Sequence, residues 1–353
     1  MPRPSLLWLL VFVPLSLALE LAHAPPLAVF VTAAIAIIPL AGLISRATES
    51  LAAEAGPRVG ALLNATFGNI TELIVAILLV AAGHQDVAKA SLMGSILGNI
   101  LLVLGASCLA GGLRYRELKF SARSTGVSST SLLLAVLALL MPALFVSFDR
   151  TSALQREVVS VVVAVVLMVL YVAALIFVQF THAPLFRATA STGEPEWRPR
   201  VAVLVLLAAA LLVGLESELL VGTLEPTVAA LGVSPLFIGL FVVAIIGNAA
   251  EHASAVVFAL HNKLEISVEI AFGSSTQIAL FVAPLLVLIS LGIGHPMDFV
   301  FSPFEVAAVF LSTLIVGVVV LDGRSNWLEG VQLLGAYVIL AISFFFVGST
   351  LGT

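Results

Sequence analysis

The sequence predicts an all-α polytopic membrane protein, and its composition and its long apolar segments are the observations that predict this. Of the 353 residues, 61% are hydrophobic and 10% are charged, and the mean hydropathy is +1.20. A soluble domain carries about 25% charged residues, so this chain could not cover the surface of a water-soluble globule. Its apolar runs are apolar on every face, which favours helices over the alternating strands of a membrane barrel.

Eleven apolar runs are long enough to be spanning helices, because a helix needs about 20 such residues to cross the hydrocarbon core. They cover approximately residues 5–22, 26–45, 58–82, 88–112, 125–147, 156–180, 200–221, 234–260, 266–292, 303–321 and 328–350. The long polar stretch 182–200 contains no apolar block, so it predicts a linker between two halves.

The charged residues and the cysteine exclude several classes of protein. The formal charge of −5 leaves no basic face for nucleic acid. The single cysteine, Cys108, excludes a disulfide framework and a multi-cysteine metal site. The protein is therefore expected to interact with the lipid bilayer and with small solutes, while a homo-oligomer is left open.

The distribution of Lys and Arg predicts the orientation of the chain. Twelve of these residues lie on the side of the N-terminus, and three, Lys89, Arg150 and Arg156, lie on the other. Cytoplasmic loops carry the excess, so the N-terminus is expected in the cytoplasm and the C-terminus outside. Residues 22–24 (Ala-His-Ala) are similar to a signal-peptide cleavage site, but Glu20 and Pro25 beside them favour a retained first helix.

Polar motifs inside the predicted segments occur twice at a constant spacing. Residues 68–72 (GNITE) match 247–251 (GNAAE), and Gly94-Ser95 matches Gly273-Ser274. Both matches are offset by 179 residues, since 251 − 72 and 273 − 94 are equal. Five crossings separate matching segments, so the second copy must enter the membrane from the opposite side. This is the inverted-repeat architecture of many secondary transporters.

The repeat divides the chain into four predicted parts. Residues 1–25 form an extra N-terminal helix, 26–181 form the first five-helix repeat, 182–199 form a cytoplasmic linker, and 200–353 form the second five-helix repeat.

The two acids of the repeated motif, Glu72 and Glu251, are the principal candidate site residues. Each lies in the middle of an apolar segment, where insertion of an acid costs about 2.5–3.5 kcal/mol. A cost incurred twice at matching positions argues for function. Asn69 and Asn248 precede the acids by three residues, so each shares a helical face with its acid.

The neighbouring polar residues complete a set of hard oxygen donors. Carboxylate, amide and carbonyl oxygens suit Ca²⁺, which takes 6–8 oxygen ligands. The additional side chains are Ser95, Asn99, Ser274 and Gln277. The glycines beside them allow close backbone approach and helix unwinding, which would add carbonyl ligands; these are Gly68, Gly94, Gly98, Gly247 and Gly273.

Two buried carboxylates that approach one another cannot both ionise cheaply, because burial and mutual repulsion raise their proton affinity. A divalent cation reverses this balance, so Ca²⁺ and protons compete for the same oxygens. The site then holds either Ca²⁺ or protons. If it reorients across the membrane only when it holds Ca²⁺ or is fully protonated, the two ions are carried in opposite directions, which is antiport. No cofactor and no catalytic group is expected.

The motifs resemble a known transporter family. NATFGNITELIVAILLV, GSILGNILLVLG, GNAAEHASAVVFAL and GSSTQIALFVAP are similar to the paired repeat motifs of the CAX family of Ca²⁺/H⁺ exchangers, within the Ca²⁺/cation antiporter superfamily. The resemblance implies that Glu72 and Glu251 bind Ca²⁺ and H⁺, and that the amide and hydroxyl residues line or brace the site. The stretch between the two halves is not a long acidic regulatory segment, and in this the chain resembles prokaryotic members of the family. The resemblance therefore implies a protein of a prokaryotic inner or plasma membrane.

Other interpretations remain open at this level. An exchanger driven by Na⁺ or K⁺ could use the same acids, and a channel or an intramembrane enzyme with paired Glu residues are further alternatives. His252 is expected to make a structural hydrogen bond rather than to relay protons. Glu216, Glu218 and Glu225 are interpreted as residues of a solvated helix end.

Overall fold

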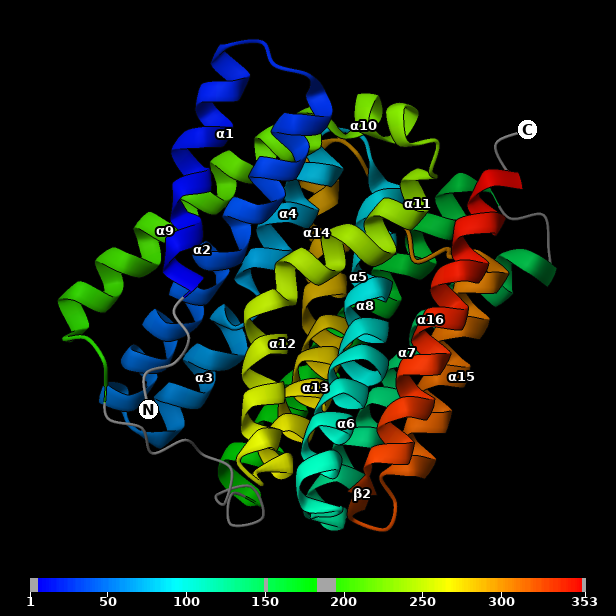
Figure 1. Ribbon diagram of the computed structural model, residues 1–353. Coiled ribbons are helices and arrows are strands. Elements are labelled where there is room, and N and C mark those ends of the chain that lie inside the picture. Colours follow the sequence, from blue (N-terminus) through cyan, green and yellow to red (C-terminus); the bar gives the residue numbers. More distant parts are fainter. Residues whose placement is uncertain (1–5, 149–151, 183–194, 351–353) are drawn as a thin grey trace. The chain divides into compact units, whose positions relative to one another are not determined.

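The computed structural model describes residues 6–148, 152–182 and 195–350, and these are helical except for short turns, the irregular segment 295–302 and two three-residue strands (Figure 1). Within these ranges, eight helices are long and apolar enough to cross a membrane. Three shorter apolar helices accompany them, at Leu6–Leu21, Ile70–Ala81 and Pro303–Val319. The all-helical membrane class is therefore confirmed. Residues 183–194 of the predicted linker and Arg150 of the charge count lie outside the described residues.

Packing divides the chain into two compact units, each of which draws on both halves of the sequence. Unit 1 comprises Met1–Ser91, Ser191–Ala250 and Phe344–Thr353, and unit 2 comprises Leu92–Ala190 and Glu251–Ser343. The boundaries fall inside three helices, α5 (Gln85–Leu97), α12 (Ala244–Leu260) and α16 (Trp327–Thr350).

The other elements of unit 1 are η1 (Leu6–Val11), α1 (Phe12–Leu21), α2 (Pro26–Ala55), α3 (Pro57–Phe67), α4 (Ile70–Ala81), α9 (Pro199–Gly222), α10 (Leu224–Leu231), α11 (Pro235–Phe237) and the π-helical turn η5 (Ile238–Val243). Its core lies between α2 and α9, which pack against each other over much of their length (Figure 1). Leu40 and Ile44 of α2 meet Leu206 and Val213 of α9 there. Together with Ala47 of α2 and Ala209 of α9, the buried residues of each helix recur every three to four positions, which gives one continuous apolar stripe.

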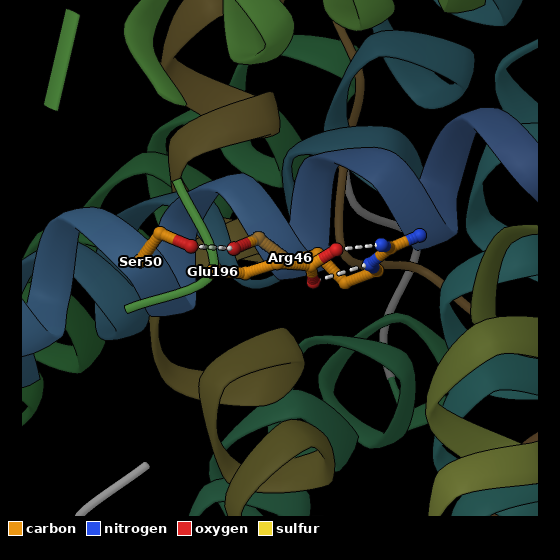
Figure 2. Close-up of polar contacts among 3 residues, drawn as sticks. All are labelled: Arg46, Ser50 and Glu196. Atoms are coloured by element: carbon orange, nitrogen blue, oxygen red, sulfur yellow. Dashed lines mark hydrogen bonds and ion pairs between the residues drawn. The ribbon is translucent and has the colours of Figure 1, made fainter. Parts of the chain in front are cut away.

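The described end of the predicted linker is attached to α2. Figure 2 shows the Arg46 guanidinium paired with the Glu196 carboxylate, with Nε 2.9 Å from Oε2 and a second contact from Nη2 to Oε1. The guanidinium also lies 5.0 Å from the centre of the Trp197 ring. Ser50 Oγ donates a hydrogen bond of 2.9 Å to the backbone carbonyl of Arg46, one turn earlier (Figure 2). These contacts fix the chain just before α9 begins at Pro199.

The other elements of unit 2 are η2 (Gly98–Val103), α6 (Leu104–Tyr115), β1 (Glu117–Lys119), α7 (Ala122–Phe148), α8 (Ala153–Ile176), η3 (Phe177–Thr181), α13 (Leu264–Gln277), η6 (Ile278–Val282), α14 (Ala283–Ile293), α15 (Pro303–Val319) and β2 (Arg324–Asn326). Helix α7 packs against α13 and α15, and α8 packs against α14 (Figure 1). The antiparallel pair β1–β2 joins the end of α6 to the start of α16.

Serine caps define two helix starts in unit 2. Ser152 and Gln155 form a capping box at α8, and Ser302 and Glu305 form another at α15. In each, the serine oxygen accepts from a backbone N–H of the first turn, and the longer side chain accepts in return from the serine N–H. Both helix starts are therefore set locally by the sequence.

Candidate ion-binding site

Glu72 lies at the start of a helix, because the predicted segment 58–82 is broken in the structure. Helix α3 ends at Phe67 and α4 begins at Ile70, with Gly68 and Asn69 between them. Asn69 adopts φ −107° and ψ 28°, outside the helical region. Glu72 thus occupies the first turn of α4 and is buried. The positive end of a helix dipole favours a carboxylate at this position.

The acid of the first motif packs against the glycine of the second. A Cβ atom added at Gly247 would lie 3.3 Å from Cγ of Glu72 and 3.7 Å from its Oε1. The Glu72 side chain therefore lies directly over the backbone of α12 within unit 1. Only glycine allows this approach without displacing the neighbour. Residues separated by 175 positions in the sequence (247 − 72) are brought together here.

The matching motif of the second copy lies in a continuous helix. Gly247, Asn248 and Glu251 all belong to α12, so the glycine does not interrupt this helix as Gly68 interrupts the first. Asn248 is fully buried, and its Nδ2 donates a 2.9 Å hydrogen bond to the carbonyl of Ala244 in the same helix. The side-chain oxygen of Asn248, and not the nitrogen, is thus the atom suited to a cation.

In unit 2, Glu251 and His252 follow directly along α12. Glu251 is partly buried, and His252 Nε2 lies 3.2 Å from Oδ1 of Asn99, a fully buried residue of η2. The amide oxygen can only accept, so the imidazole Nε2–H donates. The expectation that His252 makes a structural hydrogen bond is confirmed. Asn99 therefore supports His252, and its oxygen is already engaged.

The second motif of each copy is followed by a π-helical turn. Ser95 is buried in α5, and the π-helical turn η2 begins at Gly98. Ser274 is buried in α13, and the π-helical turn η6 begins directly after Gln277, which is partly buried. Such turns are rare and occur frequently at functional sites, since they shift side chains and free carbonyl groups. Gly98 lies in η2, where an added Cβ would be 3.8 Å from Cε1 of His252.

The remaining predicted glycines differ in their surroundings. Gly94 is buried in α5, and Gly273 lies in α13, where an added Cβ would meet nothing within 4 Å. Close packing alone therefore does not require glycine at position 273.

The described residues contain no group of three or more His, Cys, Asp or Glu side chains placed to hold a metal ion. A cation bound by these motifs would need neutral oxygens beside the carboxylates, as Ca²⁺ sites commonly use.

Unit 1 also contains a cavity of about 500 Å³, whose lining is mostly apolar, unlike the polar motifs described above. Its walls come from α2, α3, α4 and α9, and Glu54 is the charged residue among the lining residues. The other lining residues are apolar, among them Leu51, Phe67, Val203 and Leu206. A single carboxylate in an otherwise apolar lining offers a desolvated cation too few oxygen ligands, so the cavity is not the candidate site.

One expectation about the acids of the second half is wrong. Glu218 and Glu225 are exposed, as expected for a solvated helix end, but Glu216 of α9 is fully buried. The cause is α1, whose Ser16 hydroxyl lies 2.8 Å from both carboxyl oxygens of Glu216. Sequence reasoning missed this pair because a single serine in an apolar helix gives no sign of its partner.

Comparison with known proteins agrees with the motifs. The family model described as "Sodium/calcium exchanger protein" matches residues 25–180 and 201–346. A Ca²⁺/H⁺ antiporter of Synechocystis sp. is 45% identical over 96% of each chain. The Ca²⁺/H⁺ antiporter ChaA of Bacillus subtilis is 44% identical over 94% of this chain and 96% of that protein.

A solved structure is similar over the whole chain. The crystal structure of the selenium-substituted Ca²⁺/H⁺ antiporter protein YfkE is 40% identical, with a TM-score of 0.84, and the match covers 98% of this chain and 100% of that one. The paired acidic motifs, the all-helical membrane fold and these matches lead to one conclusion: the chain belongs to the sodium/calcium exchanger protein family.

Proposed function

We propose that this protein is a Ca²⁺/H⁺ antiporter that exports cytosolic Ca²⁺ in exchange for protons by alternating access. The full-length relatives named as Ca²⁺/H⁺ antiporters support a transporter rather than an enzyme. The structural observation that carries the proposal is the packing of Glu72 on Gly247, which places the acid of one motif against the backbone of the other.

In the proposed site, Glu72 and Glu251 are the principal ligands of Ca²⁺ and of the protons that replace it. Gly247 and Glu251 are four residues apart in one continuous helix and therefore share a face. Glu72 packs on that face at Gly247. The repeated motifs and the relatives named as Ca²⁺/H⁺ antiporters support one site for both acids, to which Asn69, Asn248, Ser95, Ser274 and Gln277 contribute oxygens, while Asn99 acts through His252.

Competition between the two ions gives the coupling. Without a cation, two carboxylates in a desolvated site repel each other and take up protons. Ca²⁺ brings two positive charges, which balance both carboxylates and release those protons. A site that reorients only when it holds Ca²⁺ or is fully protonated cannot leak either ion. The proton gradient then drives Ca²⁺ out of the cytosol.

The proposal includes eleven crossings, made by one N-terminal helix and two inverted five-helix repeats, with the N-terminus in the cytoplasm. The eight long and three shorter apolar helices of the described residues support this count. The single family model also matches twice, over 25–180 and 201–346, close to the boundaries expected for the two repeats.

The test is uptake of radiolabelled Ca²⁺ into proteoliposomes under an imposed pH gradient, with Na⁺ present and absent. We expect uptake that follows the pH gradient and needs no Na⁺, and we expect Glu72→Gln and Glu251→Gln to abolish it. Glu225→Gln, which alters an exposed acid, is the matched control and should transport normally. Uptake that requires Na⁺ would instead identify a Na⁺-coupled exchanger, and transport by either Gln variant of the motif acids would refute the site.

A further inference from the structure

Two acids of the described residues are buried outside the proposed ion site: Glu305, which belongs to the capping box of α15, and Glu216, whose surroundings define its chemical state. Glu216 lies in α9 on the stripe formed by Val213, Ser217 and Leu220, which packs towards the interior of unit 1. Both Glu216 and Ser16 of α1 are 0% exposed. The two helices are neighbours in Figure 1 and contact each other.

The Ser16 hydroxyl has three acceptors but one hydrogen. Its Oγ lies 2.8 Å from the backbone carbonyl of Val13 and 2.8 Å from each carboxyl oxygen of Glu216. If Glu216 were a carboxylate, three acceptor oxygens would share that one hydrogen. If Glu216 is a carboxylic acid, its O–H donates to Ser16 Oγ, and Ser16 donates to Val13. Two hydrogens then serve these contacts, one between Ser16 and Val13 and one between the Glu216 carboxyl group and Ser16.

The charges around α9 favour the same state. The titratable residues on the elements packed against α9 are Glu20 of α1, Arg46, Glu49 and Glu54 of α2, Glu72 of α4 and Glu225 of α10; α9 itself also carries Arg200 and Glu218. Arg46 pairs with Glu196, and within the described residues no cation pairs with Glu216. A buried carboxylate without a cation is far less stable than a hydrogen-bonded neutral acid.

We propose that Glu216 is a protonated carboxylic acid that positions α9 against the extra N-terminal helix through Ser16, and that its proton is not exchanged for Ca²⁺. In α2, the other helix of this core, the acids are Glu49 and Glu54 near its C-terminal end, and the interior is apolar. Helix α2 therefore has no counterpart of Glu216 in its interior.

The direct test is infrared spectroscopy of the full-length protein in lipid near pH 8. The carbonyl band that Glu216 contributes as a protonated carboxylic acid should be missing in Glu216→Gln and present in Glu218→Gln, which alters an exposed acid two residues away; any band of Glu72 and Glu251 is present in all three proteins. The band should also persist when saturating Ca²⁺ is added. Equal spectra for the wild type and Glu216→Gln, or loss of the Glu216 band on addition of Ca²⁺, would overturn the proposal.

Transport and stability give a second, independent test. The amide of Glu216→Gln can donate to Ser16 Oγ as the acid does, so this variant should keep its melting temperature and its Ca²⁺/H⁺ exchange within about twofold. Ser16→Ala should lower the melting temperature by several degrees, because it removes the partner of a buried acid. Loss of exchange in a folded Glu216→Gln protein would show that this proton takes part in transport, contrary to the proposal.

Discussion

At the scale of single residues, the position of Glu72 depends on the absence of a side chain at Gly247. The Glu72 side chain lies over the α12 backbone, so close that a Cβ atom at position 247 would be 3.3 Å from its Cγ. The sequence indicated both residues through the repeated motif, but not that one would pack on the other. Motif spacing shows that two segments are related, whereas contact between them depends on tertiary packing.

Gly247→Ala is expected to weaken Ca²⁺ transport by displacing Glu72. The added Cβ would lie 3.3 Å from Cγ, so the carboxylate must shift by a few tenths of an ångström. We expect the KM for Ca²⁺ to rise about tenfold, which corresponds to about 1.4 kcal/mol. Gly214→Ala in α9 is the control, since its Cβ would meet nothing within 4 Å. Equal effects of the two substitutions would contradict the proposed role of Gly247.

Asn99→Ala is expected to destabilise the protein through His252. It removes a fully buried side chain and leaves the imidazole Nε2–H without its acceptor. A buried donor left unsatisfied costs about 1–3 kcal/mol. A double-mutant cycle with His252→Ala, measured by thermal unfolding in detergent, should give a coupling energy of about 0.5–1.5 kcal/mol. Strictly additive effects would mean that the observed hydrogen bond contributes nothing.

At the scale of elements, apolar run length predicted where the helices lie better than where they break. The same Gly-Asn pair ends a helix at Gly68 and lies within one at Gly247. Local sequence cannot separate these outcomes, because neighbouring helices decide whether freed backbone groups find partners. The burial of Glu216 could not be predicted from hydropathy for a related reason. Lipid and protein interior are equally apolar, so the sequence of α9 does not show that α1 covers this residue. The β1–β2 pair was missed because each strand has three residues.

Close packing of α6 against α16 gives a prediction at this scale. A Cβ at Gly330 would lie 2.3 Å from the backbone nitrogen of Leu109, so the helices must separate in Gly330→Ala. We expect a loss of about 1–3 kcal/mol in the free energy of unfolding. Gly335→Ala, five residues further along α16, meets nothing within 4 Å and should leave the melting temperature unchanged. The two variants are compared by thermal unfolding in detergent.

The attachment of the linker to α2 is expected to contribute little to stability. Arg46 and Glu196 are 25% and 44% exposed, and such ion pairs contribute about 0.2–1 kcal/mol. Glu196→Gln should therefore change the melting temperature by no more than a degree or two, and less still at high salt. A large loss of stability would show that the Arg46–Glu196–Trp197 contacts hold the start of α9 more firmly than their exposure suggests.

At the scale of the whole molecule, the proposed duplication would let a chain with few polar residues supply the ligands of a divalent ion. Each copy supplies one intramembrane acid, one preceding asparagine and one serine-bearing neighbour. Composition and repeat spacing were enough to predict the membrane class and the candidate ligands. The packing of Glu72 on Gly247 could not be predicted from spacing, since it depends on which helix faces meet.

The most direct test of the central claim is proton release on Ca²⁺ binding, measured by calorimetry in buffers of different ionisation enthalpy. If Ca²⁺ and protons share Glu72 and Glu251, binding should release protons into solution, and each single Gln variant should release fewer and bind Ca²⁺ more weakly. Ca²⁺ binding that releases no protons, or the same number in the wild type and in both variants, would contradict a site shared by the two ions.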